Sequence, residues 1–280
     1  MRAYVHVPFC RQKCGYCKFA LTPFVREAQV SRYFAALFAE VSAFADAEGD
    51  VGKVETLYFG GGTPSAVGVA RIGTVIRQFS DRFGMAEDAE ITVEANPEDL
   101  TPEFCRALLE TGVTRLSVGV QSLDDAVLAT VGRKDAKTTM AGLKSAFDAG
   151  FANVNADLIL GLPQEKPKGT LSAMERLHAE FPLTHTSAYL LEEGSYPKNW
   201  SGTHADTESV REEFLACRDF LIRKGFVHYE VSNFAKPGHE SRHNRGYWER
   251  RDVRAFGLSA ASLWKGERFE NAASFAGYYR

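Results

Sequence analysis

Apolar positions along this chain recur with two different periods, which predicts strands separated by helices. Six short apolar runs are expected to be strands, and a stripe at helical spacing follows the first of them. The runs cover residues 4–9, 54–59, 91–95, 115–120, 153–160 and 184–190. The stripe consists of Val30, Phe34, Leu37, Phe38, Val41 and Phe44. Six alternations of strand and helix predict parallel strands joined by right-handed crossovers, and therefore an α/β fold.

The remainder of the chain has a less regular pattern. We expect a helix over 209–224, a strand over 226–231 and a last apolar run over 255–264. Residues 233–248 between them are polar and rich in His and Arg. Six strand–helix units are too few for an ordinary closed eight-unit barrel, and periodicity does not distinguish an open curved sheet from a partial barrel. In both, ligands bind at the carboxyl ends of the strands.

Three cysteines stand directly after the first predicted strand. Cys10, Cys14 and Cys17 have the spacing C-x3-C-x2-C. Thiolates are soft ligands that select iron–sulfur clusters, zinc or copper(I). A structural zinc site takes four ligands, usually from two separated pairs, and a second pair is missing here. Three thiolates on a [4Fe–4S] cluster would leave one iron free to bind a substrate. Zinc and three unrelated thiols remain alternatives.

Composition narrows the class of protein. The 280 residues carry a net charge of −3 and are 45% hydrophobic, so a sizeable core can form and no basic field favours nucleic acid. The sequence has no apolar run long enough to span a bilayer and no leader pattern, so we expect a cytoplasmic protein. Peripheral contact with a membrane stays open. The isolated Cys105 and Cys217 are expected to be buried as small apolar residues.

A second motif follows the second predicted strand. It reads Gly60-Gly61-Gly62-Thr63-Pro64, and glycine is needed where backbone approaches a ligand closely. Together with the cysteine spacing and the run Tyr-Val-His-Val-Pro-Phe-Cys at residues 4–10, it resembles the radical S-adenosylmethionine (SAM) superfamily, in its HemN/HemW branch. The resemblance implies a partial (β/α)6 barrel with a short C-terminal extension. It also implies a [4Fe–4S] cluster on the three cysteines that binds SAM at its open iron.

The same resemblance implies roles for further residues. Glu94, together with Gly61, Gly62 and Thr63, resembles positions that contact the SAM on the cluster, and these glycines are expected to offer backbone there. Tyr4 and Tyr16 resemble further SAM contacts. Gln121, Arg133 and Asp157 resemble residues that contact a second SAM in HemN-type oxidases. Without the resemblance, each polar residue could equally be a helix cap or a surface charge.

The stretch from His243 to Trp248 has the pattern H-N-x-x-Y-W. A neutral imidazole ligates haem iron, and aromatic rings pack on a porphyrin, although a histidine near tryptophan is usually structural. The pattern resembles the haem-binding signature of the haem chaperones in this branch. It implies haem contacts by His243, Asn244, Tyr247 and Trp248, with His239 as a weaker candidate.

The resemblance therefore favours a haem chaperone that binds a cluster, SAM and haem, and passes haem to an acceptor haemoprotein. An electron donor to the cluster is a further expected partner. Phe19 stands where HemN-type oxidases carry another cysteine, which argues against coproporphyrinogen oxidation. A true radical enzyme, either such an oxidase or a HemN-like methyltransferase, is the alternative. A simple electron-transfer protein is a third hypothesis, and whether SAM is cleaved is not decided.

Domain organisation is predicted from the same resemblance. We expect a radical SAM core over residues 1–200 and an α/β extension over 201–280 that carries the H-N-x-x-Y-W stretch. The helical C-terminal domain usual in the family is expected to be absent.

Overall fold

The computed structural model describes residues 1–23, 26–192, 200 and 206–280. Six parallel strands form the centre of its main sheet, each hydrogen-bonded to the next in chain order. They are β1 (Arg2–Val7), β4 (Val54–Gly61), β5 (Met85–Ala95), β6 (Arg115–Gln121), β7 (Val154–Leu160) and β8 (His185–Leu190). A short second pair, β2 (Phe9–Cys10) and β3 (Thr22–Pro23), flanks the cysteine loop. The predicted α/β class and the six parallel strands are confirmed.

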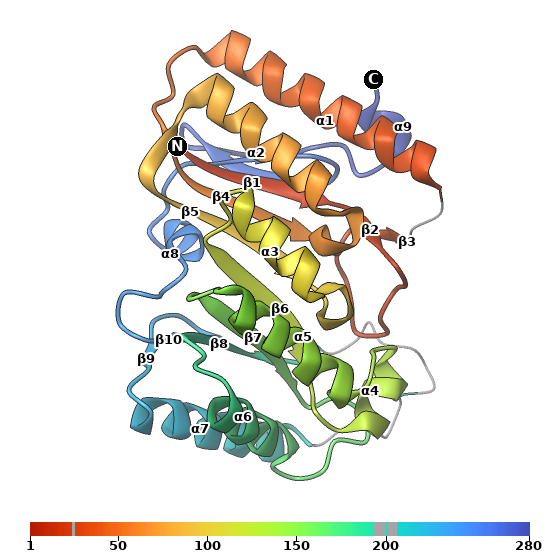
Figure 1. Ribbon diagram of the computed structural model, residues 1–280, viewed down its shortest axis with the longest axis vertical. Helices are drawn as coiled ribbons and strands as arrows, with labels where there is room; N and C mark the ends of the chain where they lie inside the picture. The colour runs from red at the N-terminus through yellow and green to blue at the C-terminus, as the bar shows by residue number, and fades with distance from the viewer. Residues whose placement is uncertain (24–25, 193–199, 201–205) are drawn as a thin grey trace.

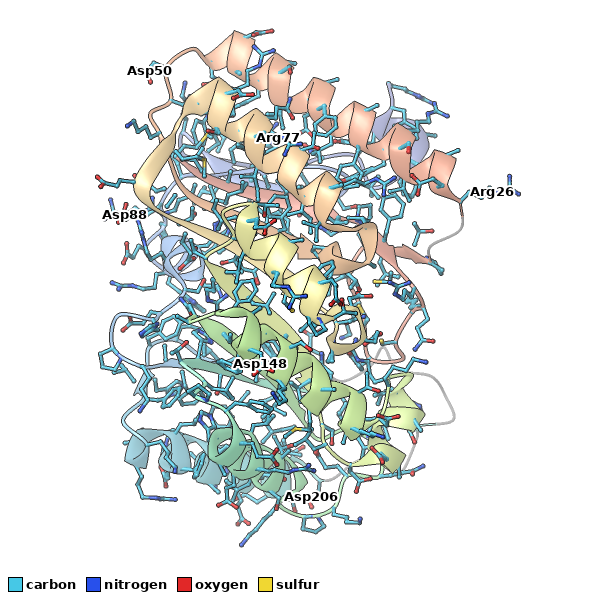
Figure 2. The ribbon with its side chains drawn as sticks, in the orientation of Figure 1. Arg26, Asp50, Arg77, Asp88, Asp148 and Asp206 are labelled. Atoms are coloured by element: carbon cyan, nitrogen blue, oxygen red, sulfur yellow. The ribbon has the colours of Figure 1, made fainter. Side chains whose placement is uncertain are left out.

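Helices cover one side of this sheet, as Figure 1 shows. They are α1 (Glu27–Glu48), α2 (Val69–Phe83), α3 (Pro102–Glu110), α4 (Asp125–Val131), α5 (Ala136–Ala149) and α6 (Gly169–Glu180). The stripe predicted on α1 faces the sheet, with Val30, Leu37 and Val41 fully buried. Ionised side chains such as Arg77 and Asp148 lie on the outer surfaces of these helices (Figure 2).

Alternate residues of each central strand face opposite sides. One set is apolar and packs under the helices, as Val5, Leu57 and Val93 do with no exposed surface. The other set lines the inner, concave side and is mainly polar or aromatic. At its carboxyl end this inner side carries the motifs predicted from the sequence.

The last part of the chain extends both edges of the sheet. Its elements are α7 (Thr207–Arg223), β9 (Val227–His228), β10 (Asn233–Ala235), α8 (Arg242–Trp248), β11 (Val253–Phe256), β12 (Ala261–Trp264), β13 (Glu267–Glu270) and α9 (Phe275–Tyr278). Strand β11 runs parallel to β1, whereas β10 pairs antiparallel with β8. The edges are β13 and β9, so the described strands form an open, partial barrel.

Two details of the predicted C-terminal part are wrong in extent. The strand expected over 226–231 is only Val227–His228, because Val231 is 66% exposed and the chain turns before β10. The apolar run 255–264 divides into β11 and β12 around a turn at Gly257, where φ is +102°. Residues 201–205, at the predicted domain boundary, lie outside the described part of the chain.

Two further points concern burial and the bilayer. Cys105 and Cys217 are fully buried, as expected. Among the described residues, the helices are all too short or too polar to cross a bilayer.

Candidate functional site

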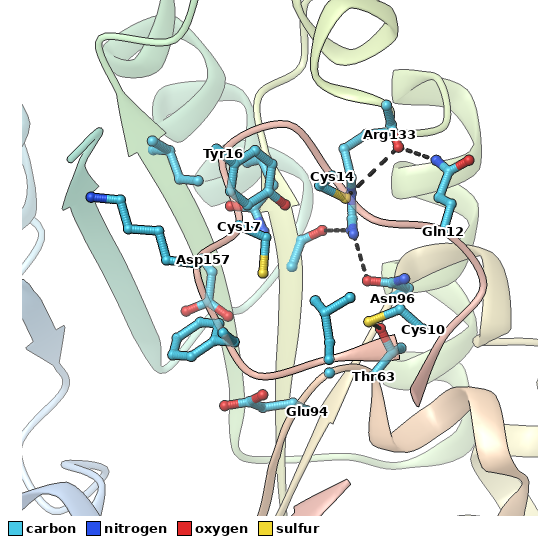
Figure 3. Close-up of a pocket in the computed structure, with 18 of the residues that line it drawn as sticks. Cys10, Gln12, Cys14, Tyr16, Cys17, Thr63, Glu94, Asn96, Arg133 and Asp157 are labelled. Atoms are coloured by element: carbon cyan, nitrogen blue, oxygen red, sulfur yellow. Dashed lines mark hydrogen bonds between the residues drawn. The ribbon is translucent and has the colours of Figure 1, made fainter. Parts of the chain in front are cut away.

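The three cysteines of the motif line one cavity at the carboxyl ends of the central strands. Its volume is about 530 Å³, and Figure 3 shows Cys10, Cys14 and Cys17 on the loop that follows β1. All three thiols are free. Cys10 is buried, with its Sγ 3.2 Å from the hydroxyl of Thr63, and Cys14 Sγ lies 3.8 Å from the carbonyl of Gly132. The structure therefore brings the sequence-predicted ligands together.

The glycine loop after β4 holds the start of the cysteine loop in place. Gly62 donates its N–H to the carbonyl of Val7 at 2.8 Å, and Thr63 donates to that of Phe9 at 2.8 Å. A Cβ on Gly62 would lie 2.7 Å from the Phe9 carbonyl oxygen, and one on Gly61 would lie 2.5 Å from the His6 ring. The two amides are thus occupied by backbone carbonyls of β1 and β2. The expected backbone contact of Gly61, Gly62 and Thr63 with SAM stays a prediction, and all three residues line the cavity.

Two carboxylates, from the strands on either side of β6, face the same cavity. Glu94, on β5, accepts a hydrogen bond from the Tyr58 hydroxyl at 2.8 Å. Asp157, on β7, accepts from Ser117 at 3.2 Å and from Asn155 at 2.8 Å. Burial raises the pKa of Glu94 to about 7 and also raises the pKa of Asp157. An ammonium group beside either carboxylate would favour its ionised form.

The cavity is also lined by Arg133, Gln121 and Tyr16. Arg133 donates to Asn96 Oδ1 at 2.6 Å and to the carbonyl of Gly119 at 2.5 Å, so its guanidinium is held against the end of β6 (Figure 3). Gln121 has φ of +69°, which turns the chain sharply where β6 ends. Asn96 was not predicted from the sequence, since an Asn before Pro usually marks only a turn.

The donor set of this cavity fits an iron–sulfur cluster. Its described lining offers three thiols and no imidazole. In the described ranges, no three Cys, His, Asp or Glu side chains converge closely enough to hold a single metal ion. A cubane does not need such convergence, because its thiolates bind separate irons. Burial raises the pKa of Cys10 to about 11, so a metal must displace its proton on binding.

His243 lies on α8, away from this cavity. Its backbone N–H donates to Glu90 at 3.1 Å, and its Nδ1 lies 2.8 Å from the Thr56 hydroxyl. Thr56 is near the start of β4, whereas the glycine loop is at the end of that strand. In Figure 1, α8 accordingly lies at the opposite end of the central strands from β2 and α4. The predicted cluster and haem residues therefore occupy opposite ends of the same strands.

The residues of the H-N-x-x-Y-W stretch differ in exposure. His243 is 1% exposed, and its Nε2 lies 3.2 Å from the Tyr247 hydroxyl, so both ring nitrogens have partners. Tyr247 and Trp248 are 43% and 60% exposed. Asn244 lies in the first turn of α8, where its N–H donates to the Ser241 cap at 3.2 Å. In this conformation the outer face of α8 is aromatic, and the imidazole lies beneath it.

Tyr4 lies between the two ends and outside the lining of the cavity. Its hydroxyl is 3.2 Å from His6 Nδ1, and its ring stacks on Tyr58 with centroids 6.0 Å apart. Tyr58 itself was missed in the sequence, where it reads as part of a buried strand. The signal available was the alternation along β4, which places Tyr58 on the same face as Gly60 and Thr56.

Comparison with known proteins adds family information to this geometry. The family model described as the radical SAM superfamily matches residues 4–177. The heme chaperone HemW of Mycobacterium tuberculosis is 38% identical over 257 residues, which cover 88% of this chain and 65% of the relative. HemW of Lactococcus lactis is 32% identical over 278 residues, covering 96% and 71%. The chain thus spans slightly less than two thirds of the length of the M. tuberculosis relative.

A solved structure supports the fold. Coproporphyrinogen III oxidase (HemN) of Escherichia coli, described as a radical SAM enzyme, superposes with a TM-score of 0.86 at 24% identity. The alignment covers 99% of this chain and 68% of that protein. At this identity the likeness concerns the architecture alone, and it agrees with the partial barrel.

Proposed function

The chain belongs to the radical SAM superfamily, in its HemW family, and we propose that it is a haem chaperone that binds a [4Fe–4S] cluster, SAM and haem. The superfamily implies the cluster and SAM. Haem and its delivery to an acceptor haemoprotein come from the name of the HemW relatives and from the H-N-x-x-Y-W stretch. The electron donor is a further proposed partner.

In this proposal Cys10, Cys14 and Cys17 hold the cluster, which supplies one-electron chemistry to bound SAM. Glu94 binds the SAM ammonium, because a carboxylate already held by Tyr58 keeps lone pairs free for another donor. The glycine loop fixes the exit of β1 and thereby positions Cys10. Gln121, Arg133 and Asp157 line the remaining space and are proposed contacts of a second SAM.

The observation that carries the haem proposal is the exposed aromatic face over a buried histidine on α8. Trp248 and Tyr247 offer flat apolar surface to a porphyrin, and Trp248 is fixed by a hydrogen bond from its Nε1 to Glu230 at 3.1 Å. Burial lowers the pKa of His243 to about 3, so its imidazole is neutral, which is the form that ligates iron. Ligation by Nε2 requires the Tyr247 hydroxyl to leave it. Asn244 is a further proposed haem contact.

The test is a haem titration of the anaerobically reconstituted protein, followed by absorbance. His243→Ala should lose stoichiometric haem binding while retaining its iron and sulfide. His239→Ala is the comparison variant, since His239 is the weaker candidate. Loss of haem in His239→Ala instead of His243→Ala would assign the ligand to His239. Because His243 is buried, thermal unfolding of His243→Ala must show a folded protein, and Trp248→Ala, at an exposed site, gives a second probe. Normal haem binding by folded His243→Ala would reject this ligand.

A second function is favoured by one observation, the size and polarity of the cavity. About 530 Å³ lined by carboxylates, an arginine and a glutamine leaves room for a substrate beside the cluster. A radical enzyme of the coproporphyrinogen oxidase or methyltransferase type would use that room. Incubation with SAM, a reductant and coproporphyrinogen III distinguishes the two functions. Product formation without haem binding would favour the enzyme, and haem binding without product would favour the chaperone.

A further inference from the structure

A row of side chains separates the cysteine cavity from His243 inside the barrel. Strand register places Tyr4 beside Tyr58, Tyr58 beside Thr92, and Thr92 beside Arg115. Thr92 and Arg115 are at most 1% exposed. Among the described residues, this row of packed side chains connects the two ends of the inner face.

Tyr58 is the member of this row with direct contacts to both ends. Its hydroxyl donates to Glu94 Oε1 at 2.8 Å on the cavity side. Its ring stacks on the imidazole of His243, with centroids 5.1 Å apart and planes inclined by 29°. Tyr4 also lies near His243, at 6.3 Å, but its hydroxyl points to His6 instead of Glu94.

We propose that Tyr58 is the positioning residue that couples the SAM site to His243, so that SAM binding opposes haem ligation. The inference rests on the proposed function, in which Glu94 binds the SAM ammonium and His243 binds haem iron. It adds that the two sites are coupled, that Tyr58 couples them, and that SAM binding weakens haem binding.

The sign follows from the contacts of Tyr58. An ammonium on Glu94 fixes that carboxylate as an anion, and a hydrogen bond from Tyr58 to an anion is stronger than one to a neutral acid. The carboxylate has lone pairs for both donors, so the two do not compete. A more firmly held Tyr58 ring stabilises the stacked position of His243, whose nitrogens are bonded to Thr56 and Tyr247. Haem ligation needs His243 to leave that position, and the equilibrium therefore shifts away from the haem-bound form.

The coupling is measured by haem titration of the reconstituted protein with its cluster kept oxidised, so that SAM binds without being cleaved. The dissociation constant of haem is measured without SAM and at saturating SAM. Tyr58→Phe removes the hydroxyl and keeps the stacked ring. Tyr229→Phe is the matched control, because it removes a hydroxyl that lies 2.7 Å from His185 Nε2 and is not bonded to Glu94. By linkage, haem must change the dissociation constant of SAM by the same factor by which SAM changes that of haem.

We expect saturating SAM to weaken haem binding of the wild type by about fivefold or more, within the range usual for coupled sites. Tyr58→Phe should bind both ligands, but SAM should leave its haem dissociation constant nearly unchanged. Tyr229→Phe should show the same SAM-induced weakening of haem binding as the wild type. The inference is overturned if SAM does not change the haem dissociation constant of the wild type, or if SAM weakens haem binding of Tyr58→Phe as much as that of the wild type. Either result leaves the chaperone proposal intact. Absence of His243-dependent haem binding overturns the chaperone proposal itself, and the inference with it.

Discussion

Gly62→Ala tests whether the glycine loop positions the cysteine loop through its backbone. The added Cβ would lie 2.7 Å from the Phe9 carbonyl oxygen, 2.8 Å from that of Val7 and 2.9 Å from the Phe9 nitrogen. These neighbours are backbone atoms of β1 and its exit, so a side-chain rotation cannot relieve the contact. The loop must retreat by about 0.7 Å to restore ordinary contact at 3.4 Å.

The cost can be worked from the contacts that this retreat breaks. Two hydrogen bonds, each 2.8 Å long, tie the loop to Val7 of β1 and Phe9 of β2, and each is worth about 1 kcal/mol. Residual strain at a packed backbone adds about 1 kcal/mol more. We therefore expect the free energy of unfolding to fall by about 3 kcal/mol. Cys10 should also shift from the other two thiols and lower cluster occupancy.

The assay is urea unfolding of the metal-free protein, with iron and sulfide content measured after anaerobic reconstitution. Gly150→Ala is the control, because its Cβ would lie 3.9 Å from the nearest atom, Leu109 Cδ1. Its cost comes only from the left-handed conformation, with φ of +109°, and is about 1 kcal/mol. Stability of Gly62→Ala within about 0.5 kcal/mol of the wild type, together with a full complement of iron, would refute the reasoning.

Three further predictions use other parts of the structure. Cys17→Ser should lose the cluster, whereas Cys217→Ser, buried far from the motif in sequence, should keep it, as iron analysis would show. Burial raises the pKa of Glu94 to about 7, so the carboxylate is protonated below that pH and SAM affinity should fall by up to about tenfold per pH unit. Titrations with SAM over a series of pH values should show this fall in the wild type. Glu94→Gln should bind SAM weakly and without this pH dependence. Burial lowers the pKa of His178 to about 4 in the folded protein, from 6.5 in the unfolded chain. Between these two values only the unfolded chain binds a proton at this histidine, so the free energy of unfolding falls as the pH falls. Urea unfolding at pH 7 and 4.5 should show a loss about 2 kcal/mol smaller in His178→Gln than in the wild type, and equal losses would contradict this.

The sequence predicted the central strands well because their burial is regular. The run 115–120 is confirmed as β6, since Leu116, Val118 and Val120 pack under helices at every second position. The prediction failed over 226–231, where the same kind of alternation is present without burial. Val227 is 45% exposed and pairs only within a two-residue strand. Hydrophobic pattern alone cannot tell an edge turn from a paired strand.

The cysteine cavity was predictable in part because its members follow strand ends. Parallel strands bring their carboxyl ends to one edge, so Cys10, Glu94 and Asp157 had to approach one another. The use of the Gly62 amide was not predictable, because a glycine that meets a ligand and one that meets another strand have the same sequence signature. Only the register of β1 against β4 distinguishes them.

The position of α8 relative to the sheet could not be predicted from the sequence, and it determines how far the proposed haem site lies from the cysteines. Periodicity assigns a residue to one face of a strand, but it does not say to which end of the sheet a later helix returns. Since His243 lies against Thr56, near the start of β4, haem bound there cannot share the cavity that holds the cysteines. The coupling proposed between the SAM and haem sites runs through the barrel interior, where Tyr58 touches both Glu94 and His243.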